Sequence, residues 1–228
     1  LFGFHATALS RAEYGMLIEH SVNRYGPSLE ALGDAALLDA AVAHMLAELR
    51  ALTVAPELGP YSGPALLEPK AAGVFFHEVL GHRLEAQRQR GEDEGQTFKA
   101  QLGKRILPTF LSVLDDPTMT QVGQVALNGA YAFDDEAVAA ERVVLVADGV
   151  LKSFLMGRRP APGFTRSNGH GRASGLHRPT ARMANLVVEA GAGQPREALV
   201  AALIAEARRQ NKPFGLIISD LAGGSTNT

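Results

Sequence analysis

Apolar positions follow a helical period in the first quarter of the chain. They are spaced alternately four and three residues apart, which places them on one stripe of an α-helix within residues 28–52. The stripe is formed by Leu38, Val42, Met45, Leu49 and Leu52. Ser28 has a side chain suited to an N-cap, so we expect the helix to begin beside it. His44 lies off the stripe, and we expect it to be solvated.

Later segments have the composition of strands. Aliphatic and β-branched residues are frequent in four segments, 110–114, 121–127, 182–189 and 214–221. We expect segments 110–114 and 121–127 to pair. The clearest pattern lies in residues 142–156, where two such runs flank Asp148-Gly149, a dipeptide typical of a primed hairpin turn. Pro195 is in a favoured first-turn position for a helix after residue 195. Short strands, hairpins and separate helices predict an α+β fold with an antiparallel sheet.

Proline and glycine interrupt the pattern in three places. Residues 55–70 contain six of these residues and predict a loop or linker. Residues 87–96 are charged and predict a solvated turn or a flap. Residues 160–179 form a glycine-rich loop that also carries cationic side chains, so it is either a loop that closes over a ligand or a flexible surface connection.

Composition excludes several classes of protein. The chain has 228 residues, 46% of them hydrophobic and 20% charged, which is typical of globular domains. Its 22 basic and 24 acidic residues give a net charge of −2, so we expect no nucleic-acid partner. There is no cysteine, and no apolar run approaches the roughly 18 residues of a membrane helix. We expect a cytoplasmic protein that does not enter the membrane.

The candidate chemistry lies in His77-Glu78-Val79-Leu80-Gly81-His82, which follows an apolar segment. Imidazole is the commonest metal ligand, and a glutamate beside it is suited to take a proton from metal-bound water. In the H-E-x-x-H metallopeptidase helix the ligands are four residues apart, whereas His77 and His82 are five apart. The alternative is a partly buried helix with two capped or solvated histidines and a surface glutamate.

A regular α-helix does not bring these two histidines together. Five residues rotate a side chain by roughly 140°, so the two rings would point to different sides. A single π-bulge would bring positions i and i+5 onto one face. Otherwise the helix would end near Gly81 and let His82 swing back. We therefore predict a local distortion of one of these two kinds.

Several motifs in order resemble the TldD/PmbA family of zinc metallopeptidases. Residues 77–85 are similar to its H-E-x-x-x-H-x-x-E signature, and residues 113–119 to the strand and acidic turn that follow. The resemblance continues in the expected order through residues 134–136, residues 148–152, the loop 167–172 and the segment 179–185. It covers residues 66–190 and extends toward Gly223-Gly224. The family is linked to the processing of peptide antibiotics and to the breakdown of unfolded peptides, and its name has also been connected with gyrase modulation.

The resemblance implies roles for individual residues. His77 and His82 would be zinc ligands, and Glu78 the general base. Glu85 would orient a ligand, or be a plain structural carboxylate. The loop that carries Asn168, His170 and Arg172 would border the substrate cleft, in which similar proteins hold an extended peptide along strand edges. The sheet would pack against the metal-binding helix.

One departure from the family concerns the third zinc ligand. The family supplies a cysteine from a later part of the chain, and this chain has none. A segment beyond it would provide the ligand, or Glu85, His170 or His177 would substitute, or the protein is not a zinc enzyme. We expect a fragment, with residues 1–60 a helical remnant of an N-terminal region plus a linker, and residues 61–228 a metallopeptidase-like domain.

Two functions follow from the resemblance. The first is a zinc-dependent peptidase for unfolded or short peptides, acting as a homodimer or as a heterodimer with a related subunit. The second is a non-catalytic peptide-binding or partner subunit that keeps the fold and lacks a complete zinc site.

Overall fold

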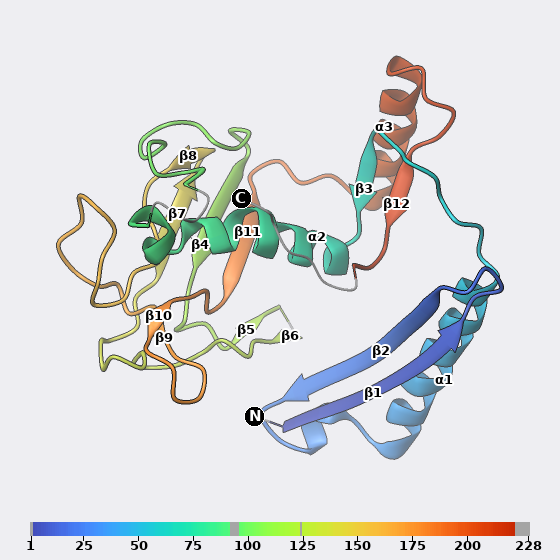
Figure 1. The fold of residues 1–228 in the computed structure, drawn as a ribbon, viewed down its shortest axis with the longest axis horizontal. Helices are drawn as coiled ribbons and strands as arrows, with labels where there is room; N and C mark the ends of the chain where they lie inside the picture. The colour runs from blue at the N-terminus through green and yellow to red at the C-terminus, as the bar shows by residue number, and fades with distance from the viewer. Residues whose placement is uncertain (1, 92–95, 124, 222–228) are drawn as a thin grey trace. The chain divides into compact units, whose positions relative to one another are not determined.

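The computed structural model describes residues 2–91, 96–123 and 125–221 (Figure 1). Its contacts form two compact units, Leu1–Ser62 with Gln121–Asn128, and Gly63–Thr120 with Gly129–Thr228. Each unit has a hydrophobic core of its own. The domains 1–60 and 61–228 stay a prediction, because compact units report contacts and not independent folding. Every helix in the described part of the chain is too short or too polar to serve as a membrane span.

The first unit contains a β-hairpin with a helix against it (Figure 1). β1 (Phe2–Arg11) and β2 (Leu17–Gly26) are antiparallel along their whole length, and α1 (Ala35–Thr53) contacts both strands. The sequence pattern did not predict this hairpin. The partly buried positions of β1 include small residues, Ala6, Ala8 and Ser10. Small residues give little difference in hydrophobicity between the two faces of a strand, so the alternation that predicts a strand is weak.

The helix α1 begins later than predicted. Asp34 is its N-cap, and the Asp34 Oδ1 accepts a hydrogen bond from the Leu37 backbone N–H at 2.8 Å. Ser28 instead accepts from the Ala31 N–H at 3.3 Å, beside a 3₁₀ turn at Glu30–Leu32. Gly33 separates the two elements because its φ of 98° lies in the left-handed region.

The apolar stripe of α1 is confirmed only in its middle. Met45 and Leu49 are buried, with 3% and 5% of their surface exposed, whereas Leu52 is exposed. His44 is exposed as predicted.

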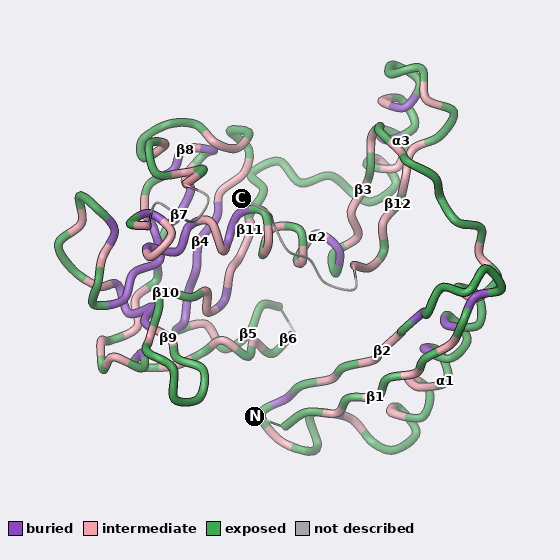
Figure 2. The backbone as a smooth tube through the Cα atoms, in the orientation of Figure 1, coloured by how far each residue is buried: buried purple, intermediate pink, exposed green. Residues whose placement is uncertain are grey.

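An antiparallel sheet forms the centre of the second unit, as the sequence predicts. Its strands lie in the order β11-β4-β7-β8, and each neighbouring pair is antiparallel. They are β4 (Leu111–Asp115), β7 (Val143–Ala147), β8 (Val150–Leu151) and β11 (Leu186–Ala190). Val113, Leu145, Val146 and Leu151 have no exposed surface. In Figure 2, stretches of buried residues appear in purple along β4 and β7.

The hairpin between β7 and β8 confirms the turn expected at Asp148-Gly149. Asp148 has a φ of 48° and Gly149 a φ of 78°. Two positive φ values are the signature of a type I′ turn, which matches the twist of the flanking strands. A Cβ on Gly149 would lie 2.2 Å from the Leu107 carbonyl oxygen, so glycine is required there for space as well.

Two local predictions for the middle of the chain were wrong. β5 (Gln121–Val122) pairs with β6 (Val125–Ala126), and neither of these two strands pairs with β4. Part of the segment 87–96 is not solvated, because Gln89 is 1% exposed and donates a hydrogen bond to the Arg83 carbonyl oxygen at 2.8 Å. Residues 92–95 lie outside the described part of the chain.

A smaller group of elements comes from the first and last parts of the sequence of the second unit. β3 (Ala65–Leu67) and β12 (Leu216–Ile218) form a parallel pair, and α3 (Arg196–Arg209) contacts β3. The helix begins directly after Pro195, as predicted. The strand expected at 214–221 is confirmed in shorter form, and Gly223-Gly224 lies outside the described residues.

Candidate metal centre

A π-helical turn brings the two histidines of the motif together. α2 (Pro69–Phe76) continues into a π-helical turn at His77–Gly81 and then into a 3₁₀ turn at His82–Leu84. The wider turn contains one more residue than an α-helical turn, so His82 returns to the face of His77. The two ring centroids are 4.6 Å apart, and the rings are inclined by 82°. The predicted π-type distortion is therefore confirmed.

Gly81 lets this turn approach the segment before β11. A Cβ at Gly81 would lie 2.0 Å from the Met183 Sδ and 3.2 Å from a Leu186 methyl group. Both distances are shorter than ordinary van der Waals contact. The absence of a side chain at this position therefore allows close packing directly beside His82.

Three donor groups converge at the turn. One ligand atom each from His77, Glu78 and His82 lies within 4.8 Å of the others, and no further cluster of this kind occurs among the described residues. The side chains are partly open to solvent, with 49%, 21% and 25% of their surface exposed. Two imidazoles and a carboxylate suit a zinc ion, and partial exposure leaves access for a substrate. The chemistry of this donor set therefore fits a catalytic metal.

Glu85 fixes the orientation of the His82 ring. Its Oε1 lies 2.8 Å from the His82 Nδ1, and the Glu85 side chain has no exposed surface. A carboxylate accepts hydrogen bonds, so the proton of this contact is on Nδ1 and the lone pair of the neutral ring is on Nε2. A carboxylate that holds the second nitrogen of a histidine is a common companion of metal ligation.

Other side chains hold Glu85 in turn. The Arg182 guanidinium and the Gln87 amide each donate to its Oε2 at 2.8 Å, and the Arg88 Nε lies 3.6 Å from the same oxygen. Arg182 follows β10 (Thr180–Ala181), so a distant part of the chain completes this arrangement. No sequence pattern indicates this role for Gln87, because it depends on proximity in space.

Burial adjusts the protonation of His77. Desolvation and then the neighbouring His82 hold the pKa of His77 below its ordinary value, and the carboxylates of Glu78 and Glu85 only partly oppose this. A lowered pKa keeps the imidazole neutral at pH 7, which is the form that binds a metal.

The three residues considered as substitutes for the third ligand lie outside the cluster. Glu85 is engaged by His82 and Arg182. His170 is completely buried and engaged elsewhere. His177 is exposed in the loop between β9 (Gly171–Arg172) and β10.

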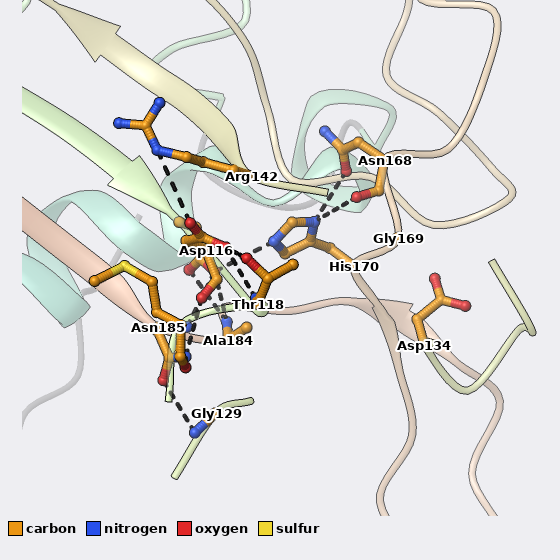
Figure 3. A network of polar contacts seen from close by, with 12 residues as sticks. Asp116, Thr118, Gly129, Asp134, Arg142, Asn168, Gly169, His170, Ala184 and Asn185 are labelled. Atoms are coloured by element: carbon orange, nitrogen blue, oxygen red, sulfur yellow. Dashed lines mark hydrogen bonds and ion pairs between the residues drawn. The ribbon is translucent and has the colours of Figure 1, made fainter. Parts of the chain in front are cut away.

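Asn168 and His170 belong to a buried polar network (Figure 3). The His170 Nε2 lies 3.2 Å from the Asp115 Oδ1, and its Nδ1 lies 2.9 Å from the Asn168 carbonyl oxygen. The Asn168 amide donates to the Phe154 carbonyl and accepts from the Met156 N–H. These contacts hold the glycine loop against the sheet. The role of Asn168 and His170 in substrate binding stays a prediction, and the direct contacts of both side chains are with the protein.

Asp115 is a structural residue whose partners the sequence did not reveal. Its carboxylate accepts from the Ala184 and Asn185 backbone N–H groups at 3.1 Å. It thereby links the end of β4 to the segment that precedes β11. The sequence indicated only an acidic turn here, because the partners lie about 70 residues away.

Arg172 differs from its two neighbours in the predicted substrate site. Its guanidinium carbon lies 4.5 Å from the centre of the Tyr131 ring, and its Nε lies 3.9 Å from the Asp135 carboxylate. About a third of its side chain is exposed, so it can still reach a ligand. Burial raises the pKa of Tyr131 to about 12, which keeps its hydroxyl protonated while it donates to the Gly169 carbonyl.

A family model described as the PmbA/TldA metallopeptidase C-terminal domain matches residues 60–228. Curated relatives agree with it. A protein named metalloprotease from Methanocaldococcus jannaschii is 36% identical over 127 residues, which are 55% of this chain and 27% of the relative. A protein named zinc metalloprotease TldD homolog from Saccharolobus solfataricus is 33% identical over 103 residues, 45% of this chain and 21% of the relative. The chain thus spans between a fifth and a third of the length of these relatives.

Solved structures share the fold. A Thermotoga maritima protein described as a candidate modulator of a DNA gyrase has a TM-score of 0.65 at 20% identity, covering 87% of this chain and 42% of that one. The structure of TldE from Thermococcus kodakarensis has a TM-score of 0.61 at 16% identity, covering 97% of this chain and 46% of that one. At this level of identity the similarity shows the fold alone, and it agrees with the α+β architecture described above.

Proposed function

This chain belongs to the PmbA/TldD metallopeptidase family, and from that premise we propose that it contributes the metal centre of a zinc-dependent peptidase acting on unfolded or short peptides. The observation that carries the proposal is the π-helical turn, which gathers the donor atoms of His77, Glu78 and His82 within 4.8 Å.

In this proposal His77 and His82 hold the metal, His82 through its Nε2. Zinc bound there would act as a Lewis acid and would lower the pKa of its bound water to about 7. Glu78, whose Oε1 lies 3.9 Å from the His77 Nε2, accepts the proton of the attacking water. Glu85 keeps the His82 ring in one orientation and one tautomer.

The substrate side of the proposal rests on strand geometry. β11 is an edge strand of its sheet within the described residues, and an edge strand can pair with an extended peptide. Arg172 supplies a charged contact to the peptide. Asn168 and His170 act by holding their loop in place.

A second candidate is a peptide-binding or partner subunit without catalysis. It is favoured by the size of the donor set, because a base role for Glu78 leaves two protein ligands among the described residues, and a catalytic zinc usually has three. Under either proposal we infer assembly as a homodimer or with a related subunit, in the cytoplasm.

The direct test is bound zinc. We expect near-stoichiometric zinc by elemental analysis in the purified chain, little in His77→Ala, and unchanged zinc in His44→Ala, which removes an exposed histidine outside the cluster. Glu78→Gln should keep zinc and lose cleavage of an unfolded peptide such as reduced, alkylated insulin chain. Equal and negligible zinc in all variants, with zinc supplied, would remove the peptidase proposal. Negligible zinc together with binding of the uncleaved peptide would favour the second candidate.

A further inference from the structure

A hollow lies between α2 and the strand β11, directly beside His77. It has a volume of about 520 Å³, within the range of small-ligand pockets. Its lining includes Gly73, Phe76 and His77 from the helix side, and Met183, Leu186 and Val188 from the strand side. Apart from His77, none of the lining residues carries an ionisable side chain.

We propose that this hollow selects the substrate, by accepting one large uncharged apolar side chain of a peptide next to the bond that is cleaved. The inference rests on the proposed peptidase function and assigns it a substrate class. The hollow is hereafter called the α2–β11 pocket.

The position of the pocket follows from the geometry of the helix. Gly73 in α2 and His77, which directly follows α2, are four residues apart on one helical face, so these two lining residues lie about 6 Å apart along the helix axis. This is about the reach of a side chain next to the reacting carbonyl group. A peptide that places this carbonyl beside His77 therefore has a neighbouring side chain at the mouth of the pocket.

The walls of the pocket are apolar and already held in place. Phe76, Met183, Leu186 and Val188 are partly buried and pack against the main hydrophobic core. Leu186 and Val188 alternate along β11 and therefore point to the same face of the strand. A lysine side chain entering the pocket would lose its hydration, and no lining residue carries a carboxylate to pair with it, so we expect lysine to be disfavoured at this position.

At Gly73 the helix side of the pocket lining has no side chain. A Cβ at this position would meet no heavy atom within 4 Å. The residue is exposed, and its φ is not positive. A larger side chain at position 73 would therefore fill the pocket without disturbing the helix, and leucine also favours helix more than glycine does.

The experiment compares three fluorescein-labelled Gly/Ser nonapeptides that differ only in a central Leu, Ala or Lys. Affinities are measured by fluorescence anisotropy on the full chain carrying Glu78→Gln, so that binding is observed without turnover. We expect the Leu peptide to bind about tenfold more tightly than the Ala peptide, from partial burial of the extra methyl and methylene groups. We expect the Lys peptide to bind no better than the Ala peptide.

Gly73→Leu should reduce the ratio of the Leu and Ala affinities to about one while keeping the affinity for the Ala peptide. Gly193→Leu is the matched control, because position 193 is equally open and lies outside the pocket lining. Val188→Thr, which keeps the shape and adds a hydroxyl, should lower the ratio severalfold. Equal affinities in the parent protein, or a Leu preference that survives Gly73→Leu, would overturn the inference.

The same peptides separate this inference from the peptidase proposal. Cleavage by the wild-type chain, followed by mass spectrometry, reports catalysis, whereas anisotropy reports the pocket. Binding with a Leu preference but no cleavage and no zinc would refute the peptidase and keep the pocket. Zinc-dependent cleavage with equal rates for the Leu and Ala peptides would keep the peptidase and refute the pocket.

Discussion

Replacing Gly81 by alanine tests whether close packing at the π-helical turn shapes the candidate metal centre. Two effects oppose each other. Alanine favours helical backbone over glycine by about 1 kcal/mol. The new methyl group would lie 2.0 Å from the Met183 Sδ, and such overpacking typically costs about 1–3 kcal/mol. We therefore expect Gly81→Ala to lower the free energy of unfolding by about 0–2 kcal/mol.

The sign of the effect should reverse when Met183 is shortened. In a Met183→Ala background the sulfur atom is gone, and only the Leu186 methyl group at 3.2 Å remains close. Gly81→Ala should then stabilise the protein by up to about 1 kcal/mol. The coupling between the two positions, from a double-mutant cycle, should be about 1–3 kcal/mol.

The assay is urea unfolding followed by circular dichroism at 222 nm, on the wild type, both single variants and the double variant. Zinc affinity is measured in parallel, because a displaced turn moves His82 relative to His77. We expect weaker zinc binding in Gly81→Ala and recovery in the double variant. Equal destabilisation by Gly81→Ala in both backgrounds would show that the Met183 contact does not control the turn.

Two further predictions concern the polar residues around the site. Glu85→Gln should weaken zinc binding about 10–100-fold by competition with a chromophoric chelator, because an amide holds the His82 Nδ1–H less strongly than a carboxylate does; an unchanged affinity would leave Glu85 as a purely structural carboxylate. The tyrosinate absorbance at 295 nm should contain a step near pH 12 that Tyr131→Phe removes. Because the folded-state pKa of Tyr131 is raised, its contribution to stability is complete below pH 10 and is lost as the pH rises toward 12. Allowing for partial exposure, that contribution is about 1–2 kcal/mol, and a step that persists in Tyr131→Phe would assign the shift to another residue.

The sequence by itself determined features that depend on neighbouring residues. Asp148-Gly149 predicts its hairpin because only a few residues adopt two successive positive φ values. Pro195 predicts a helix start because its φ is already helical. The residue types at positions 77, 78 and 82 predict metal chemistry, since imidazole and carboxylate are metal ligands in any fold.

Predictions from the local sequence pattern were wrong where the two faces of a strand differ little in hydrophobicity, and where two segments could take the same role. Small residues on the partly buried positions of β1 hid a long hairpin. Asp34 replaced Ser28 as the cap of α1, because Gly33 ends the preceding turn first. β5 and β6 paired with each other instead of joining β4, since pairing with an adjacent segment closes a shorter loop.

Only the tertiary structure decided how the candidate metal site is built. The spacing of His77 and His82 allowed either a π-bulge or an early helix end, and the π-helical turn is the one that occurs, with Gly81 packed against Met183. The contacts of Glu85 with His82 and Arg182 were likewise not visible in the sequence. These outcomes depend on contacts between segments about 100 residues apart. Residue periodicity carries no information on such contacts, because it records only which face of an element is apolar.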